Sequence, residues 1–218
     1  MPEVKPLKYK ELKGFLTDKQ LSEHHDVLYA GYCKNLDKIR ENIKKADLEN
    51  VNATFSDLRE LKIEETFAAN GVRLHEYYFD NMHAGGKPAT GKIADLLKRD
   101  FGSVEAWDKQ FRACGVGARG WVVLAYDLED GKIHNYVADA HNQGGVWNAI
   151  PLLILDVYEH AYFVDYATGR KKYIEGFMQN VDWDAVNKRL EKWVQWLKFH
   201  GLEEMLVLAL KTLGDRFL

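Results

Sequence analysis

The sequence has few cysteines, and their scarcity excludes a fold held together by disulfide bonds. Only Cys33 and Cys114 occur in 218 residues, too few for a disulfide framework. Cys33 lies in a segment with helical periodicity and Cys114 lies just before a glycine-rich turn. The Cys-x-x-Cys spacing of many zinc and redox sites is missing. We interpret both side chains as buried thiols, not as metal ligands or nucleophiles.

Long apolar runs and blocks of like charge are also missing. No apolar run approaches the roughly 18 residues that span a membrane, and residues 1–5 lack the apolar core of a secretion signal. Lysine and arginine number 30 against 33 aspartate and glutamate, a formal net charge of −3. No basic block marks a nucleic-acid-binding surface. These absences predict a cytoplasmic protein that has neither a nucleic acid nor a membrane as its partner.

A long N-terminal helix is predicted by apolar residues that recur every three or four positions. They are Leu21, Leu28, Tyr32, Leu36, Ile39 and Ile43. The pattern predicts one amphipathic helix of about six or seven turns. His24, Leu28 and Tyr32 follow each other at four-residue steps, so we expect them in one column on one face. His25, beside this column, is expected to be solvated.

The elements that follow are predicted from periodicity and turn signals. Polar residues 49–52 are typical of a turn, and a second helix is predicted over residues 63–82. After a loop over residues 83–88, helices are predicted over residues 90–99 and 103–113, with Ser103 as the N-cap of the second. Apolar runs predict strands over residues 121–127, 132–139 and 151–155. Asp130-Gly131 is a hairpin turn signal between the first two strands.

This order of elements predicts an α+β fold. An N-terminal antiparallel helical hairpin is followed by an α/β domain with a three-stranded antiparallel sheet. We expect two domains, residues 1–84 and residues 85–218. An extra C-terminal helix is expected over residues 202–217, where apolar residues recur at helical spacing. This helix is expected either to pack on its own subunit or to contact another one.

A glycine motif in the middle of the chain does not indicate a nucleotide site. Residues 115–120 spell G-x-G-x-x-G, which in a dinucleotide-binding fold follows a strand and opens a helix. Here a predicted helix comes before the motif and a predicted strand comes after it. We therefore reject nucleotide binding at this position.

An aspartate and a histidine stand where the last predicted strand ends. The apolar run 150–155 leads into Asp156, and His160 follows four residues later. Carboxylate oxygen and neutral imidazole nitrogen are both ligands of first-row transition metals. A buried hydrogen bond between Asp156 and His160 at a turn is the alternative, and this stretch by itself leaves both interpretations open.

Three stretches resemble one known family. Residues 156–162, Asp-Val-Tyr-Glu-His-Ala-Tyr, resemble the D-x-W-E-H-A-Y signature of the iron/manganese superoxide dismutases, with Tyr158 at the usual Trp position. Residues 74–79 resemble the family's N-H-x-x-Y/F-W, whose histidine, His75 here, is a metal ligand. His24 and Tyr32 have the spacing of the ligand and the tyrosine on the family's first helix. The resemblance extends from about residue 17 to about residue 192.

The resemblance implies an ion, a substrate and a reaction. His24, His75, Asp156 and His160 would bind one Fe or Mn ion per subunit. Superoxide would be the substrate, and an ion that changes oxidation state would convert it to oxygen and hydrogen peroxide. The alternative is a catalytically weak metal-binding scaffold of the same fold.

The resemblance also implies which residues surround the ion. Tyr32 matches the tyrosine that guards the substrate funnel, and Trp121 matches a tryptophan that lines the metal cavity. Some members have a Gln or a His at the position of His141, where it hydrogen-bonds metal-bound solvent. Tyr32 and His141 are therefore the candidate catalytic residues, which carry or orient protons. For His141, a histidine in a surface loop is the alternative.

A homodimer, or a tetramer, is a further implication of the resemblance. Glu159 would reach across a two-fold interface to the partner's His160. A second polar bridge of the family joins a His and a Tyr, at positions that here hold Leu28 and Phe163. Because both polar groups are replaced together, no buried donor or acceptor is left without a partner. We expect Leu28 and Phe163 to make apolar contact at this interface.

Overall fold

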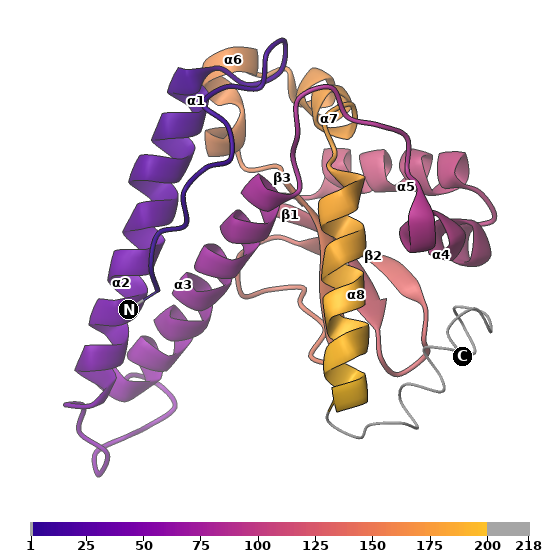
Figure 1. Cartoon of the computed structure of the whole chain (residues 1–218). Coiled ribbons are helices and arrows are strands. Elements are labelled where there is room, and N and C mark those ends of the chain that lie inside the picture. Colours follow the sequence, from indigo (N-terminus) through magenta and orange to yellow (C-terminus); the bar gives the residue numbers. More distant parts are fainter. Residues whose placement is uncertain (1, 200–218) are drawn as a thin grey trace.

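The computed structural model describes residues 2–199, and the predicted helix over residues 202–217 lies outside this range. The first arm of an antiparallel hairpin consists of α1 (Asp18–Ser22), the π-helical segment η1 (Glu23–Tyr29) and α2 (Ala30–Ile43). The second arm is α3 (Asp57–Asp80), which lies beside α2 in Figure 1. The hairpin is the N-terminal half of the predicted fold.

The first arm is not the continuous α-helix that was predicted. In η1 the hydrogen bonds span five residues instead of four, so a turn contains more residues and the residues after it are rotated. Leu21, His25, Tyr29 and Cys33 are buried, whereas Leu28 is only half-buried. The expectation of a solvated His25 is wrong, because only 5% of its surface is exposed. The expected column through Leu28 is likewise interrupted by the π-helical turn.

The next helices follow the predicted order with longer ranges. Helix α3 begins at Asp57, before its predicted start, and α4 (Gly91–Phe101) and α5 (Val104–Gly117) follow. Ser103 caps α5, since its hydroxyl accepts a hydrogen bond from the backbone N–H of Ala106 at 3.0 Å. The first two glycines of the G-x-G-x-x-G stretch belong to α5. A Cβ atom at Gly115 would lie 3.0 Å from Ile174 Cδ1, so glycine lets α5 approach the elements behind it.

The sheet has three antiparallel strands, as predicted. They are β1 (Trp121–Asp127), β2 (Ile133–Ala138) and β3 (Ala149–Asp156), in the order β2-β1-β3. Asp130-Gly131 lies between β1 and β2, and Gly131 has a φ of 67°, which glycine adopts without strain. In the register, Trp121 pairs with Asp156 on one side and with Ala138 on the other. The sheet therefore brings Trp121 beside Asp156.

The C-terminal part of the described chain is helical. It contains the 3₁₀ turn η2 (Glu159–Ala161) and the helices α6 (Phe163–Tyr166), α7 (Arg170–Met178) and α8 (Trp183–Phe199). Arg189 of α8 is buried and donates to a carboxylate oxygen of Asp80 at 2.9 Å and to the carbonyl oxygen of Leu152. Helix α8 is thereby fastened to both the end of α3 and the sheet.

The end of α3 is bonded directly to the last strand. The side-chain amide of Asn81 donates to the carbonyl oxygen of Ile154 at 3.2 Å, and the N–H of Ile154 donates to Asn81 Oδ1 at 3.0 Å. Asn81 is fully buried, so both bonds are shielded from water. This pair fixes the hairpin relative to β3 close to the point where the strand ends at Asp156.

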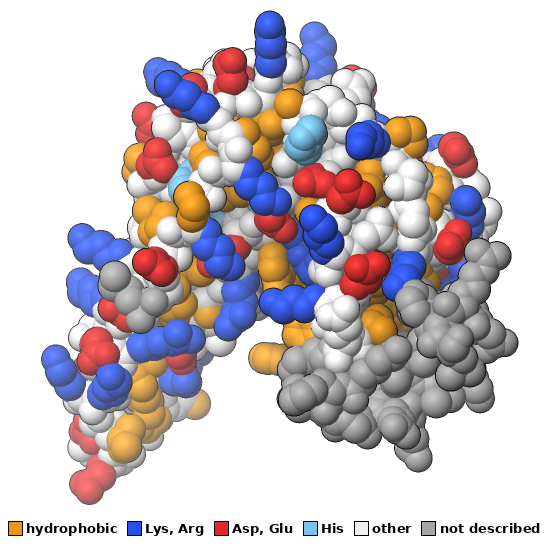
Figure 2. Space-filling view, in the orientation of Figure 1, with side chains coloured by type: hydrophobic (Ala, Val, Ile, Leu, Met, Phe, Trp, Pro, Cys, Tyr) orange, Lys and Arg blue, Asp and Glu red, His pale blue; other side chains and the backbone are white. Residues whose placement is uncertain are grey.

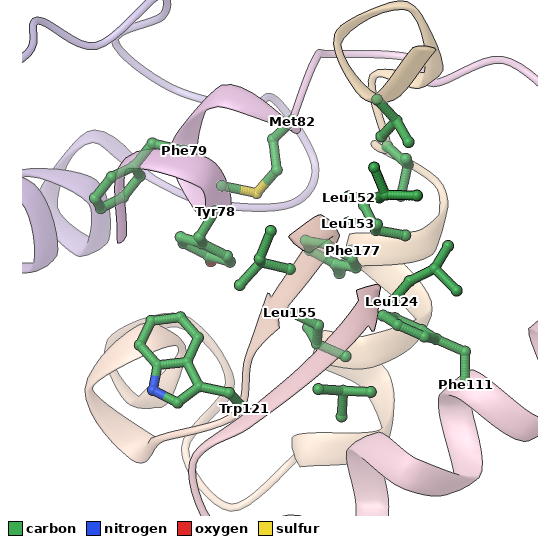
Figure 3. Close-up of a cluster of buried hydrophobic side chains, with 14 of the residues drawn as sticks. Tyr78, Phe79, Met82, Phe111, Trp121, Leu124, Leu152, Leu153, Leu155 and Phe177 are labelled. Atoms are coloured by element: carbon green, nitrogen blue, oxygen red, sulfur yellow. The ribbon is translucent and has the colours of Figure 1, made fainter. Parts of the chain in front are cut away.

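A single hydrophobic cluster extends from the hairpin to the sheet (Figure 3). Tyr78 of α3 faces the apolar side chains of β3, and Phe111 and Phe177 reach the same cluster from α5 and α7. The ring of Phe79 points the other way and packs on His24, His25 and Tyr29 of η1. Residues 152–155 are all fully buried. Burying each of these side chains contributes about 1.5–3 kcal/mol. The predicted α+β class, a helical hairpin before a three-stranded antiparallel sheet with helices, is confirmed.

The surface in Figure 2 carries positive and negative side chains side by side. This mixture agrees with the nearly balanced counts of acidic and basic residues. Among residues 2–199, no helix combines the length and the apolar character that crossing a membrane requires.

Candidate metal centre

The structure brings together four side chains from four different elements. His24 comes from η1, His75 from α3, Asp156 from the end of β3, and His160 from η2. One ligand atom of each lies within 4.8 Å of the ligand atoms of the other three. His24, His75 and Asp156 are at most 1% exposed, and the side chain of His160 is 26% exposed. The four residues form a buried cluster with one more open side.

One carboxylate oxygen lies at the centre of this cluster. Asp156 Oδ2 is 3.2 Å from His24 Nε2, 3.2 Å from His160 Nε2 and 3.7 Å from His75 Nε2. Oxygen and nitrogen donors that share an ion at about 2.0–2.2 Å lie roughly 3–4 Å from one another. The spacing of the four side chains therefore fits a shared cation.

Two of these histidines have buried ring nitrogens that lack a hydrogen-bond partner among the described residues. Within the described chain, His24 Nε2 and His75 Nε2 are buried and have no hydrogen-bond partner. A buried polar atom left in this state costs about 1–3 kcal/mol. His75 Nδ1 lies 2.5 Å from the carbonyl oxygen of Gly71, so Nδ1 carries the proton and the Nε2 lone pair faces the cluster. Both nitrogens fit metal ligation.

The charges of the cluster suit a cation as well. Burial lowers the pKa of His24 and lowers that of His75 well below its ordinary value, so both rings are neutral. Burial acts to raise the pKa of Asp156, but His160 and His24 outweigh it and hold the pKa below its usual range. Three imidazoles and one carboxylate, without a thiolate, suit iron, manganese or zinc.

A second group of potential ligands lies on the hairpin between β1 and β2. It consists of Asp127, Asp130 and His134. His134 Nε2 lies 2.9 Å from Asp130 Oδ2, and Asp127 Oδ2 accepts a hydrogen bond from Tyr136 at 2.8 Å. The other carboxylate oxygens of both aspartates accept backbone N–H groups of the turn. This group is accounted for by its own hydrogen bonds, unlike the buried cluster.

A chain of three hydrogen-bonding side chains stands beside the cluster. His141 is 4% exposed, which is inconsistent with a histidine in a surface loop. The indole N–H of Trp121 donates to His141 Nδ1 at 2.9 Å, and His141 Nε2 lies 2.7 Å from the hydroxyl oxygen of Tyr32. An indole nitrogen only donates hydrogen bonds, so His141 Nδ1 is the acceptor. His141 Nε2 therefore carries the ring proton and donates a hydrogen bond to the Tyr32 oxygen. Tyr32 therefore has its own hydroxyl proton left to donate.

Comparison with known proteins decides the family. Residues 89–189 match the model of the C-terminal domain of iron/manganese superoxide dismutases. A superoxide dismutase [Fe] of Aquifex aeolicus is 38% identical over 193 residues, covering 85% of this chain and 89% of that protein. The chain belongs to the iron/manganese superoxide dismutases. A superoxide dismutase [Mn] of Haloarcula marismortui is 35% identical over 196 residues, covering 88% and 94% of the two chains. A superoxide dismutase [Fe] of Cupriavidus metallidurans is 38% identical over 193 residues, covering 86% and 95%.

Several neighbours of the cluster were not predicted from the sequence. The amide of Gln20 donates to the carbonyl oxygen of His160 at 2.7 Å, and the hydroxyl of Tyr173 donates to the carbonyl oxygen of Asp156 at 2.7 Å. The ring centroid of Phe67 lies 4.4 Å from that of His141. Each contact joins residues that are not neighbours in the sequence, so no local sequence pattern predicts the contact.

Tyr158, which replaces the family's usual tryptophan, lies over the cluster. Its ring is nearly parallel to that of His160, with centroids 5.1 Å apart, and it meets His141 edge-on at 5.3 Å. Its backbone N–H donates to Asp156 Oδ1 at 2.9 Å, which leaves the other carboxylate oxygen for the imidazoles. Tyr158 thus contacts two members of the cluster and the neighbouring His141.

Of the residues expected at a dimer interface, Glu159 and Phe163 are exposed to solvent and Leu28 is half-buried. The side chain of Glu159 is exposed and makes no hydrogen bond or ion pair with any residue in the described range. Phe163 is 48% exposed, Leu28 is half-buried, and the neighbouring Val27 and Val164 are 59% and 50% exposed. The exposed carboxylate of Glu159 and the exposed apolar side chains of Val27, Phe163 and Val164 are groups that a partner can cover.

Proposed function

We propose that His24, His75, Asp156 and His160 bind one Fe or Mn ion per subunit and that the protein disproportionates superoxide there. The observation that carries this proposal is the buried set of ring nitrogens without hydrogen-bond partners around one carboxylate oxygen. When bound, iron or manganese supplies the one-electron exchange that turns two superoxide ions into oxygen and peroxide. Zinc fits the same donors but does not change oxidation state.

The residues around the cluster support a proton supply for this reaction. Burial raises the pKa of Tyr32 to about 12, so its hydroxyl keeps its proton at neutral pH. Burial lowers the pKa of His141 to about 4, so its ring stays neutral and keeps the tautomer that Trp121 selects. Peroxide needs two protons to leave as hydrogen peroxide, and we propose that Tyr32, its orientation set by His141, donates one of them and is reprotonated by solvent, while solvent supplies the other.

The ligands themselves would be oriented by neighbouring groups. His75 donates from Nδ1 to Gly71, and the carbonyl of His160 accepts from Gln20. Asp156 receives the N–H of Tyr158 on the oxygen that does not face the imidazoles. Such contacts would keep the donor atoms of these three residues aimed at the ion.

The test combines metal content with turnover on the same sample. Apoprotein is loaded separately with Fe, Mn and Zn, the bound ion is counted, and superoxide consumption is followed by rapid mixing. We expect activity with Fe or Mn and none with Zn at equal occupancy. Full Fe or Mn occupancy without superoxide consumption would instead identify a catalytically weak metal-binding scaffold.

We propose further that the protein is a homodimer, or a dimer of such dimers. The exposed Glu159 and the exposed apolar side chains of Phe163 and Val164 support this assembly, in which Glu159 pairs with the partner's His160. His160 uses Nε2 toward Asp156, and its Nδ1 has no partner in the described chain. We also keep the division into residues 1–84 and 85–218, and a cytoplasmic location, as proposals. Limited proteolysis and cell fractionation test these two.

A further inference from the structure

The N-terminal segment over residues 3–12, here called the N-terminal strap, runs along the helical hairpin in Figure 1. Lys5 in the strap makes three contacts with the hairpin. Its carbonyl oxygen lies 2.7 Å from His25 Nε2, its backbone N–H donates to Tyr29 Oη at 3.1 Å, and its Nζ lies 2.5 Å from Glu76 Oε2. One strap residue therefore joins η1 to α3.

The partners of Lys5 stand next to two of the proposed ligands. His25 follows His24 in η1, and Glu76 follows His75 in α3. The same two helical segments must keep a fixed separation for His24 and His75 to share an ion. The contacts of Lys5 act on the backbone positions where that separation is set.

Tyr29 is the centre of these contacts. It is 1% exposed, and its hydroxyl accepts from Lys5 and donates to Glu76 Oε1 at 3.2 Å. Burial raises its pKa, so the hydroxyl stays a donor at neutral pH. Its ring centroid lies 5.1 Å from that of His25 and 6.4 Å from that of His75, nearly parallel to the latter. Tyr29 thus contacts both helical segments with its ring and its hydroxyl.

His24 depends on such support more than His75 does. His75 Nδ1 is held by the carbonyl of Gly71, but His24 Nδ1 has no hydrogen-bond partner in the described chain. The direction of the His24 ring therefore follows from its backbone and its packing. That backbone is π-helical, a conformation that is rare and that occurs mainly as short interruptions of α-helices.

We propose that Lys5 and Tyr29 are positioning residues, which hold η1 against α3 so that His24 and His75 keep the separation required by the ion. This inference rests on the proposed metal site. A cavity of about 370 Å³ lies between the strap and the hairpin, lined in part by Lys5, His25, Tyr29 and Glu76. Hydrogen bonds, not dense packing, connect the strap to the two segments there.

The test is Tyr29→Phe, which removes both hydroxyl contacts and keeps the ring. The matched control is Tyr136→Phe, which removes a hydroxyl bonded to Asp127 at 2.8 Å on the far edge of the sheet. The loaded proteins are mixed with excess chelator, and the rate of ion release is followed with the visible absorption of the trivalent ion. Urea unfolding of each apoprotein measures the change in stability that does not involve the ion.

We expect Tyr29→Phe to release its ion roughly tenfold faster than the wild type and to shift the absorption band, and Tyr136→Phe to do neither. Lys5→Met, which removes only the exposed ion pair to Glu76, should release its ion at close to the wild-type rate. Wild-type release and an unshifted band in Tyr29→Phe would overturn the inference.

Two further outcomes are distinguishable. A wild type that binds neither Fe nor Mn contradicts the proposed function itself, before the strap is tested. If Tyr29→Phe does not fold, Glu76→Leu takes its place, since it removes the acceptor of the Tyr29 hydroxyl, whereas Lys5→Met removes only the ion pair. Faster release in Glu76→Leu than in Lys5→Met supports the inference, and equal release in the two contradicts it.

Discussion

His141 Nε2 lies 2.7 Å from the hydroxyl of Tyr32, although 109 residues separate them in the chain. The second nitrogen of the ring accepts the indole N–H of Trp121 at 2.9 Å. The direction of both hydrogen bonds is therefore set by the indole, which has no acceptor. His141 does not accept the hydroxyl proton of Tyr32, so Tyr32 keeps that proton for the donor role that we propose.

The first prediction concerns the Tyr32 hydroxyl. Tyr32→Phe should bind the ion as the wild type does, because Tyr32 is not among the ligands. Its turnover should fall by roughly 10- to 100-fold, the low end of general acid effects, because water still delivers protons more slowly. Rapid-mixing kinetics at several pH values measure the loss. The same turnover in both proteins would show that Tyr32 has no part in proton delivery.

The second prediction concerns the acid stability of the apoprotein. His141 titrates near 4 when folded and near 6.5 when unfolded, so the unfolded chain binds the proton more readily between these values. His24 and His75 have lowered pKa values for the same reason, burial. The free energy of unfolding should be highest above about pH 6.5 and should fall as the pH drops toward 4, by about 1–3 kcal/mol for His141 alone.

The control for this prediction is His141→Gln. Glutamine does not titrate and still offers a donor to Tyr32, so the fall in stability with acidification should be less steep. Urea unfolding of both apoproteins at a series of pH values gives the two slopes. Parallel slopes would assign the acid sensitivity to other groups.

Much of the site was predictable because its residues belong to short sequence patterns that can be recognised without the structure. Asp156 and His160 follow an apolar strand, and His75 lies on a helix with clear periodicity. The sheet was predictable because Asp130-Gly131 marks its first turn and β3 is continuously apolar. These features depend on neighbours in sequence, which a reader of the sequence can see.

The rest depends on contacts between distant residues. His25 was expected in solvent because nothing near it shows that the carbonyl of Lys5 will accept its proton. The π-helical η1 was not predicted because side-chain spacing does not reveal which carbonyl each N–H will reach. Gln20 bonds to His160 across 140 residues, and only the assembled fold places them together.

The third prediction concerns a buried hydrogen-bond chain behind the ligands. Tyr173 donates to the carbonyl of Asp156 at 2.7 Å, so Tyr78, at 2.9 Å, is the donor to Tyr173. Tyr173→Phe leaves the hydroxyl of Tyr78 without an acceptor, which should lower the free energy of unfolding by about 1–3 kcal/mol. Removing both hydroxyls, in Tyr78→Phe with Tyr173→Phe, should cost less than the sum of the two single changes. Additive costs from urea unfolding would mean that the two hydroxyls are not coupled.

The last prediction concerns the proposed dimer. Glu159→Ala removes a carboxylate that, in this assembly, accepts a hydrogen bond from the partner's His160. His160 would lose the group that orients its Nδ1, so both dimer affinity and ion content should fall. Sedimentation over a range of protein concentrations and metal analysis of the same fractions measure the two effects. Glu175→Ala, a change of an exposed glutamate on α7, should alter neither.

Leu28→His should not add a polar bridge, because Phe163 offers it no acceptor. A wild type that is monomeric at micromolar concentration would contradict the dimer, and Glu159→Ala that stays dimeric with its ion bound would contradict the bridge.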